Sequence, residues 1–361
     1  MKKVVIGGEY YYSPTMLFKK KKFDINNYLK KKYPEKFFCF TGGGYYSIFK
    51  IIKEIGFKNY QEILLPSYLC PTILIPFRKR NIKYKFFKVK KNLEIDIEDL
   101  ESKITKNTKA VFFINYFGFP PKEKEILFLK ELKSKKIILI EDCVQSFFSN
   151  IELIGDYAFN SFRKFLPIDG SVIITDNIIN KSCKSKSFTK YFFLKYIGQQ
   201  LRRLSIDFKI LDLSKIFLKL FNMANKNYYL HSDVKFNWWN KLLLSKFDIN
   251  LIKKQRLSNY KYLLNNFKNI AFYKNIYDNI VPLGFPVLIG KNRDFIKNKL
   301  IDNNIFCPVH WNLSNEISKN KYFDSWYLSA NIMTFPINEN VTENEIIYLK
   351  QKLEEYHECL S

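Results

Sequence analysis

The sequence predicts a layered α/β fold, in which helices cover a mostly parallel, mixed sheet. Between residues 37 and 176, short apolar segments alternate with segments of helical periodicity. The apolar segments lack the polar alternation of a half-exposed sheet, which indicates strands that are covered on both faces. The 361 residues also exceed the usual size of one hydrophobic core, so we expect two lobes.

The expected strands follow one another at regular intervals, with helices between them. The strands are 37–40, 62–66 (EILLP), 84–89, 110–116 (AVFFINY), 137–142 (IILIED) and 171–175. The helices are 46–55, 71–81, 97–104 and 122–134. In folds of this class, ligands bind beyond the carboxyl ends of the strands. The segments 41–46, 66–71 and 142–146 each follow a strand and are therefore the first places to look for a site.

The second half of the sequence has a different character. Residues 181–250 are basic, aromatic and helical in pattern. Beyond them we expect a long connecting helix at 251–267, strands at 281–289 and 331–336, and helices at 293–303 and 343–356. We therefore expect a large domain at 1–250 and a smaller α+β domain at 251–361.

The composition favours some partners and disfavours others. The formal net charge is +26, with 60 Lys+Arg against 34 Asp+Glu, which attracts anionic ligands. The lysines are spread along the chain, however, so the excess also fits the amino-acid bias of an AT-rich genome. Six cysteines form no CxxC pair and there are three histidines, so we expect no metal site. No apolar stretch is long enough to span a bilayer, and the few cysteines suit the cytoplasm; a weak attraction to membrane surfaces stays open.

A glycine run, Gly42-Gly43-Gly44, lies between the first strand and its helix. Backbone N–H groups and the helix dipole can hold a phosphate there, although such a turn is also a common structural device. The run matches neither GxGxxG nor a P-loop, which disfavours a dinucleotide or nucleoside-triphosphate site.

Asp142, Gln145 and Lys164 are the side chains that suggest chemistry. Asp142 ends an apolar strand, where a carboxylate needs a cationic partner; a protonated pyridine nitrogen would serve, and so would a helix cap or a salt bridge within the protein. Lys164 is flanked by apolar residues, which favour the neutral, nucleophilic amine that Schiff-base chemistry requires.

The order of these motifs resembles the DegT/DnrJ/StrS family of nucleotide-sugar aminotransferases, in particular the branch whose lysine motif reads Arg-Lys-x-Leu-Pro. The resemblance covers nearly the whole chain. It is carried by Gly7-Gly8-Glu9, Pro66–Pro71, Tyr116-Phe117-Gly118, Glu141–Ser146, Gly155-Asp156, Ser161–Pro167, Asp169-Gly170 and Thr334–Ile337. It implies the fold-type-I architecture of enzymes that depend on pyridoxal 5'-phosphate.

The resemblance also implies residue roles. Lys164 would carry the cofactor and later move a proton, Asp142 would face the ring nitrogen, and Gln145 would lie near the ring hydroxyl. The phosphate would be held by Ser161 and by the turn of Gly44, Tyr45 and Tyr46. The chain departs from the family at two places. Cys70 stands where the family often has an aromatic that packs on the cofactor ring, which makes Tyr68 a candidate for this contact. In the phosphate turn, Tyr45 and Tyr46 replace small residues. His310 corresponds to a segment on the substrate side, or is an ordinary histidine of the small lobe.

The implied reaction takes an amino group from an amino acid, expected to be glutamate, through pyridoxamine phosphate to a nucleotide-linked keto sugar. The product would serve surface polysaccharide or glycan synthesis, and a homodimer is expected. One alternative is a pyridoxamine-phosphate-dependent sugar dehydratase, but such relatives commonly carry histidine in place of Lys164. Another is a non-catalytic basic protein that binds anionic membrane or nucleic acid through residues 181–221, where no nucleic-acid motif is present.

Overall fold

The computed structural model describes residues 4–179, 189–208 and 212–356. Its centre is a seven-stranded sheet in the order β2-β8-β7-β6-β5-β3-β4. Only β8 runs against its neighbours, β2 and β7; the other pairs are parallel. The strands are β2 (Phe37–Thr41), β3 (Glu62–Pro66), β4 (Lys83–Phe87), β5 (Thr108–Ile114), β6 (Ile138–Asp142), β7 (Tyr157–Phe159) and β8 (Ser171–Thr175).

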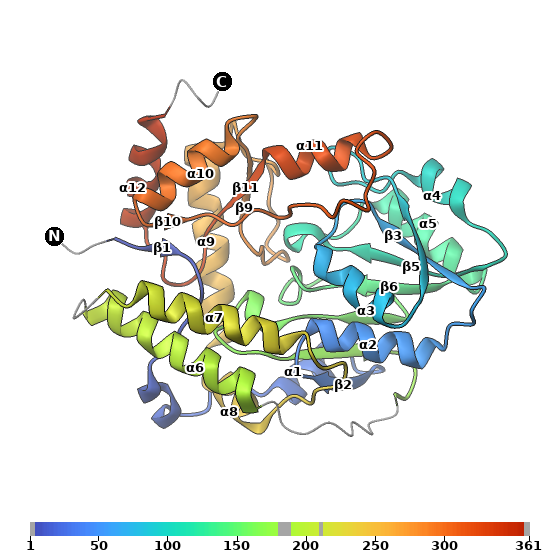
Figure 1. The fold of residues 1–361 in the computed structure, drawn as a ribbon, viewed down its shortest axis with the longest axis horizontal. Helices are drawn as coiled ribbons and strands as arrows, with labels where there is room; N and C mark the ends of the chain where they lie inside the picture. Colours follow the sequence, from blue (N-terminus) through green and yellow to red (C-terminus); the bar gives the residue numbers. More distant parts are fainter. Residues whose placement is uncertain (1–3, 180–188, 209–211, 357–361) are drawn as a thin grey trace.

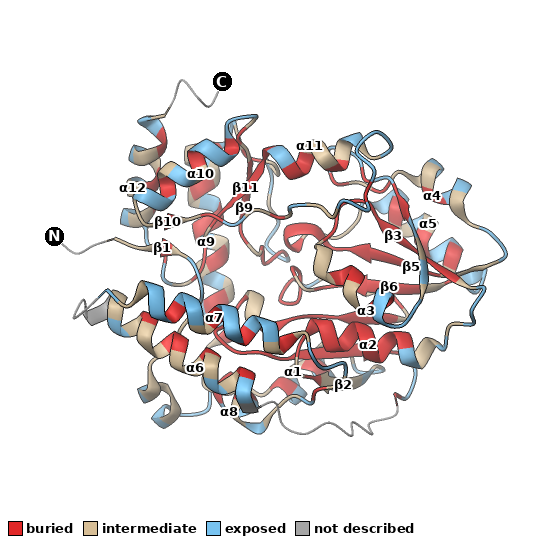
Figure 2. Ribbon diagram, in the orientation of Figure 1, coloured by how far each residue is buried: buried red, intermediate tan, exposed pale blue. Residues whose placement is uncertain are grey.

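Helices connect and cover these strands (Figure 1). They are α1 (Ile25–Lys32), α2 (Gly44–Ile55), α3 (Leu74–Lys79), α4 (Ile97–Lys103) and α5 (Glu123–Ser134). Every residue of β3 and β8 is buried, and the centre of the sheet is coloured as buried throughout in Figure 2. Burial on both faces explains why the strand sequences show apolar runs without alternation. The predicted fold class is confirmed.

The segment after β8 forms a pair of helices, α6 (Thr189–Arg203) and α7 (Ser214–Tyr228), which pack against each other along the lower edge of the molecule in Figure 1. Buried polar contacts tie α6 to the loop before β8. The Lys195 ammonium lies 2.9 Å from the Asp169 carboxylate, and Gln199 Nε2 donates a hydrogen bond to the carbonyl of Pro167 at 3.2 Å. The described part of this basic segment is therefore anchored to the large lobe. A short helix, α8 (Trp238–Leu244), follows.

The C-terminal lobe begins with the long helix α9 (Ile249–Phe267). It continues with β9 (Phe285–Leu288), α10 (Arg293–Asp302), β10 (Ile305–Phe306), α11 (Phe323–Asn331), β11 (Ile332–Phe335) and α12 (Glu343–Glu354). β11 pairs antiparallel with β9, while β10 pairs in parallel with β1 (Ile6–Gly7) from the start of the chain. A division at residue 250 stays a proposal, and it would leave β1 apart from its own sheet.

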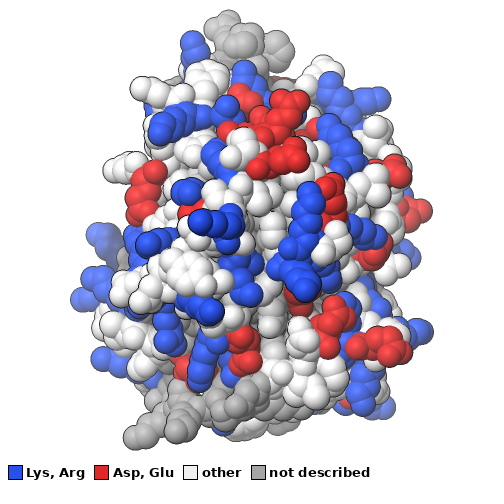
Figure 3. Space-filling model, turned by 90° about the vertical axis from the view of Figure 1, so that its right-hand side faces the viewer, with Lys and Arg blue, Asp and Glu red and all other residues white. Residues whose placement is uncertain are grey.

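The helices and the metal-ligating side chains of the described residues bear on the expected partners. None of the helices in the described ranges combines the length and apolar character needed to cross a membrane. Within the same ranges, His, Cys, Asp and Glu side chains form no group of three that could hold a metal ion. On the face drawn in Figure 3, Lys and Arg lie interspersed with Asp and Glu and do not form one basic patch.

Candidate active site

A small cavity at the carboxyl ends of the central strands, which we call the inner cavity, brings together most of the expected residues. Asp142 and Lys164 both line it, although one ends β6 and the other lies on the 3-10 turn Phe162–Lys164. The other expected residues on its wall are Gly44, Tyr45, Cys70, Gln145 and Ser161. Lys164 and Asp142, 22 positions apart in the chain, therefore share one cavity.

The Lys164 amine lies in apolar surroundings. Phe162, Phe165 and Leu166 on either side of it are almost wholly buried. Burial lowers the pKa of the Lys164 amine, and the neighbouring Arg163 guanidinium lowers it further. A lowered pKa increases the fraction of neutral amine, which is the nucleophilic form.

Two successive carboxylates at the end of β6 have different environments, because adjacent residues of a strand point to opposite faces. Glu141 accepts hydrogen bonds from the N–H groups of Ile154 and Gly155 at 3.0 and 2.9 Å, and from Asn115 Nδ2 at 2.8 Å. Those donors balance the cost of burying it. It therefore has a structural role under the sheet.

Asp142 faces the inner cavity with fewer donors. Among the described residues its carboxylate accepts one hydrogen bond, from the Val144 N–H to Oδ1 at 2.8 Å. Burial raises the pKa of Asp142 to about 7, against the opposing effects of that hydrogen bond and of nearby Lys164. A buried carboxyl with free acceptor capacity is suited to a cationic N–H group.

Gln145 is held by one end of its amide. Its Oε1 accepts the Phe117 N–H at 2.5 Å, while Nε2 is buried and has no partner among the described residues. An unpaired buried donor costs roughly 1–3 kcal/mol. Because Gln145 lines the inner cavity, a ligand oxygen placed there would satisfy this donor.

The opposite end of the cavity can hold a small anion. The N–H groups of Gly44 and Tyr45 begin α2 and meet no acceptor within the described ranges. The Ser161 Cβ lies 3.6 Å from the position that a Cβ on Gly44 would take, so its hydroxyl adjoins the same turn. Backbone donors at a helix N-terminus beside a hydroxyl suit a phosphate.

The bulky tyrosines of this turn are accommodated by the end of α7. The Tyr45 hydroxyl donates to the Tyr229 carbonyl at 3.3 Å, and the Tyr46 hydroxyl donates to the Tyr228 carbonyl at 2.6 Å. Position 43 must be glycine, because an added Cβ would lie 2.0 Å from the Tyr228 hydroxyl. The tyrosines thus link the anion turn to the α6–α7 pair.

Two expected residues lie outside the inner cavity. The Tyr46 side chain points to Tyr228 and its N–H bonds to the Gly43 carbonyl, so the structure does not bring Tyr46 to the cavity wall, and its phosphate contact stays a prediction. Tyr68 is fully buried behind the wall, packed against Tyr116 and Trp311, so it does not present its ring to the cavity either.

A larger cavity of about 600 Å³, the outer cavity, adjoins the inner one through Arg163, Lys164 and Tyr229. It lies between the N-terminal segment, α7 and the C-terminal lobe, and its wall includes His310. The Nδ1 atom of His310 lies 2.9 Å from Thr334 Oγ1. Burial, with help from Lys164, lowers the pKa of His310 to about 3, so the ring is neutral near pH 7.

Among the wall residues of the inner cavity that sequence reasoning missed are Arg163, Tyr229 and Trp311. Arg163 adjoins Lys164 in the chain and lies over the Tyr228 ring, with Cζ 4.8 Å from its centroid. Its place in the lysine motif could have identified it. Tyr229 and Trp311 come from distant segments, and no local pattern marks them.

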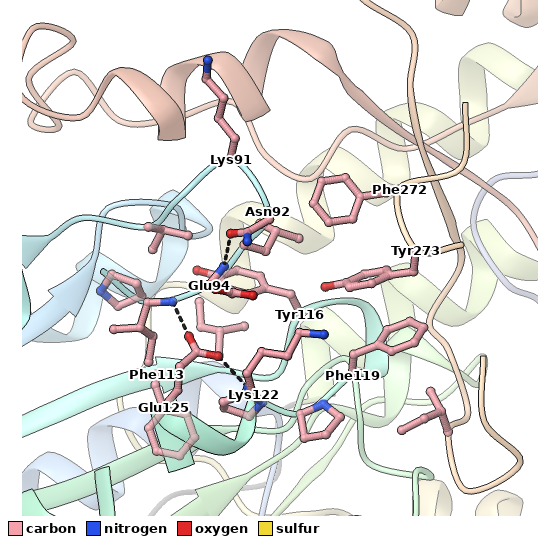
Figure 4. A pocket seen from close by; sticks show the side chains of 18 of the residues that line it. Lys91, Asn92, Glu94, Phe113, Tyr116, Phe119, Lys122, Glu125, Phe272 and Tyr273 are labelled. Atoms are coloured by element: carbon pink, nitrogen blue, oxygen red, sulfur yellow. Dashed lines mark hydrogen bonds between the residues drawn. The ribbon is translucent and has the colours of Figure 1, made fainter. Parts of the chain in front are cut away.

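A further cavity of about 750 Å³, larger than the inner and outer cavities, lies between the two lobes and is drawn in Figure 4; we call it the lobe cavity. Its walls include a stacked ring pair, Phe119 and Tyr273, with centroids 3.9 Å apart. Its buried carboxylate, Glu125, accepts hydrogen bonds from the N–H groups of Ile95 and Lys122. Lys164 and Asp142 are not part of its wall, so size alone does not identify the candidate site.

Comparisons with known proteins bear on this site. Residues 51–181 match the model of the DegT/DnrJ/EryC1/StrS aminotransferase family. Over 134 residues the chain is 29% identical to the GDP-4-keto-6-deoxy-D-mannose 3-dehydratase of Yersinia pseudotuberculosis, a match that spans 35% of this chain and 34% of the dehydratase. The matched segment thus spans about a third of this curated relative.

Solved structures extend the likeness over the whole fold. The sugar aminotransferase CalS13 of Micromonospora echinospora superposes with a TM-score of 0.65 at 13% identity, covering 96% of this chain and 93% of that one. The E. coli GDP-4-keto-6-deoxy-D-mannose-3-dehydratase, solved with bound hydrated PLP, superposes with a TM-score of 0.64 at 19% identity, covering 91% and 90%. The fold is that of fold-type-I transferases. Over residues 51–181 the chain is thus similar in sequence to the DegT/DnrJ/EryC1/StrS aminotransferase family, and beyond that segment the likeness is one of fold.

Proposed function

We propose that the protein is a pyridoxal-phosphate-dependent aminotransferase that transfers an amino group from an amino acid, glutamate in our expectation, to a nucleotide-linked keto sugar. The observation that carries the proposal is the shared cavity of Lys164 and Asp142, with the Gly44 turn at its other end. These groups match the three parts of the cofactor that need partners: its aldehyde, its ring nitrogen and its phosphate.

The fit to the cofactor rests on unsatisfied groups. The Gln145 amide presents a buried donor without a partner, and the N–H groups of Gly44 and Tyr45 present two more. Ser161 adds a hydroxyl to the phosphate end. A ligand with a ring hydroxyl and a phosphate would use all of these donors, whereas an apolar ligand would leave them unpaired.

When bound, pyridoxal phosphate supplies an aldehyde that takes up the amino group and a pyridinium ring that draws electrons from the reacting carbon. Asp142 would hold the ring nitrogen protonated, because the charged pair is favoured in this dry site. Lys164 would hold the aldehyde through its amine until the incoming amine displaces it. The freed, neutral Lys164 amine would then move a proton between the amino-acid carbon and the cofactor carbon. Lys164 stands between the inner and outer cavities, where both tasks can be performed.

The outer cavity supports the assignment of a large anionic substrate. Its wall carries Arg163, Lys297 and the neutral His310, against one carboxylate from Glu9. Cationic groups favour a diphosphate, and a cavity of about 600 Å³ suits a ligand of nucleotide-sugar size.

A sugar 3-dehydratase of the same family is the second candidate, because the matched relative bears that name. Those relatives resemble this chain but commonly place a histidine where this chain has Lys164. An amine that can bind the aldehyde and be displaced again favours transamination, so the dehydratase is the weaker proposal.

The two candidates are separated by one experiment. The purified protein is incubated with pyridoxal phosphate, glutamate and a panel of nucleotide-linked 3-keto and 4-keto sugars, while the cofactor absorbance and the products are followed. We expect glutamate to convert the cofactor to its amine form and one sugar to return it, with an amino sugar as product. A deoxy-keto sugar formed without a new C–N bond would instead identify the dehydratase, and no absorbance change at all would contradict both.

The homodimer and the cytoplasmic location expected from the resemblance stay proposals. Sedimentation of the purified protein at micromolar concentration would contradict the dimer if it gave a single species of 43.3 kDa.

A further inference from the structure

The cofactor ring, as placed by the proposed function, would lack the aromatic cover expected from the loop after β3. Position 70 holds a cysteine, whose Sγ lies 3.1 Å from Thr72 Oγ1. Tyr68, the nearest aromatic in that loop, is buried behind the wall of the inner cavity. A planar ring gains binding free energy from apolar or aromatic contact on its faces, so the missing partner has to come from elsewhere.

A tryptophan from the C-terminal lobe lies on the wall of the same cavity. Trp311 lines the inner cavity together with Cys70, Val144 and Lys164. The other rings on the wall serve other parts of it: Tyr45 and Tyr229 belong to the anion end, and Phe159 ends a strand of the sheet floor. Trp311 is the aromatic contributed from the C-terminal lobe.

Trp311 is braced by several contacts. Its ring centroid lies 5.5 Å from that of Tyr68 and 6.2 Å from that of Tyr116. The His310 ring stands perpendicular to it at 5.7 Å, and the Ser329 hydroxyl donates to the Trp311 carbonyl at 2.7 Å. The Tyr116 hydroxyl in turn bonds to the Tyr68 carbonyl. A side chain fixed in this way loses little conformational freedom when a ligand packs on it.

We propose that Trp311 covers one face of the cofactor ring, in place of the aromatic residue that Cys70 does not supply, while Val144 contacts the other face. The inference rests on the proposed function. It assigns to this chain a ring contact from the C-terminal lobe, so that both lobes take part in holding the cofactor.

The test measures cofactor binding and not turnover. Cofactor-free protein is titrated with pyridoxal phosphate, and the visible absorbance and the quenching of tryptophan emission give the dissociation constant. We expect Trp311→Ala to weaken binding about tenfold and Trp311→Phe to weaken it by less than about threefold, since the phenyl ring keeps the contact. The decisive variant is Cys70→Phe combined with Trp311→Ala, which restores an aromatic at position 70 and should recover most of the lost affinity.

Trp326 provides the matched control. It lies on α11, its Nε1 donates to the Ile317 carbonyl at 2.9 Å, and it is not on the cavity wall. Quenching by the bound cofactor should fall sharply in Trp311→Phe and remain in Trp326→Phe. If Trp311→Ala binds as tightly as the unchanged protein, or if Cys70→Phe rescues nothing while the double variant keeps its melting temperature, the inference is wrong. If the unchanged protein binds no pyridoxal phosphate, the proposed function fails with it.

Discussion

The inner cavity and the lobe cavity each contain a buried carboxylate, and these two groups differ in what binds them. Glu125, in the lobe cavity, receives backbone N–H groups on both oxygens. Asp142, in the inner cavity, receives one donor at one oxygen, and the neighbouring Gln145 keeps a donor unpaired. The fold therefore satisfies the buried carboxylate of the larger cavity, while the smaller cavity leaves hydrogen-bonding capacity on Asp142 and Gln145 for a ligand. Unsatisfied polar groups locate this site better than volume does.

The largest effect should come from the lysine of the inner cavity, and a lysine of the lobe cavity provides the control. Lys164→Ala should remove the covalent link to the cofactor and lower the transamination rate by about a thousandfold or more. Lys122→Ala, on the wall of the lobe cavity, should leave the covalent link to the cofactor and the transamination rate unchanged. Absorbance of the bound cofactor and single-turnover rates measure the difference. Equal losses in the two variants would remove the distinction between the cavities.

Asp142→Asn should come next. The amide can keep the hydrogen bond from the Val144 N–H but cannot hold the ring nitrogen protonated, so we expect a rate lower by about a hundredfold. The control is Glu141→Gln on the opposite face of β6, which should lower the melting temperature and leave the cofactor spectrum as it was. A spectrum altered only by the change at 141 would reverse these assignments.

The pH dependence of the free energy of unfolding should also report on the burial of Asp142. Asp142 has a folded pKa of about 7, above its ordinary value of 3.8, so the folded state binds this proton more tightly than the unfolded state. The contribution of Asp142 to the stability of the cofactor-free protein therefore falls as the pH rises from about 4 to 7.

Asp142→Asn should remove this loss, by at most about 4 kcal/mol at pH 8, with little difference from the unchanged protein near pH 4. Urea unfolding of cofactor-free protein at both pH values measures it. A stability gain that is the same at the two pH values would contradict the buried, cofactor-facing position of Asp142.

The smallest effect is expected at Glu125. Glu125→Gln would leave one of the two backbone N–H groups, of Ile95 or Lys122, without its acceptor, at a cost of about 1–2 kcal/mol. Cofactor affinity should stay within about twofold of the unchanged protein. Denaturant unfolding and cofactor titration give the two values, and a strong loss of affinity would show that the lobe cavity also serves the cofactor.

Much of the fold could be predicted from the sequence, because fully buried strands appear in it as continuous runs of apolar residues. The strands at 62–66 and 171–175 have the expected bounds. β7 was missed because its three residues are too few to form a pattern, and the antiparallel direction of β8 depends on its neighbours and not on its own residues. Part of the basic segment, residues 180–188 and 209–211, lies outside the described residues.

The site was predictable where its residues follow strands. Asp142, Gln145 and Lys164 carry local signals, since each lies next to a buried apolar run. The orientations of Tyr46 and Tyr68 could not be predicted from the sequence. Tyr46 points away from the cavity because its hydroxyl bonds to the Tyr228 carbonyl, and Tyr68 packs against Trp311. These contacts join segments more than a hundred residues apart, so no local pattern in the chain predicts them.

The N-terminal strand has a practical consequence for handling the protein. β1 is paired with β10, and just beyond it the Tyr10 hydroxyl accepts a hydrogen bond from Arg256 at 2.6 Å and donates to the Lys164 carbonyl at 3.5 Å, across 154 positions of the chain. An affinity tag fused close to the first residue, or a protease cut before Tyr10, would disturb the backbone that carries the reactive amine. Purification handles should therefore be joined through a long linker or at the other terminus.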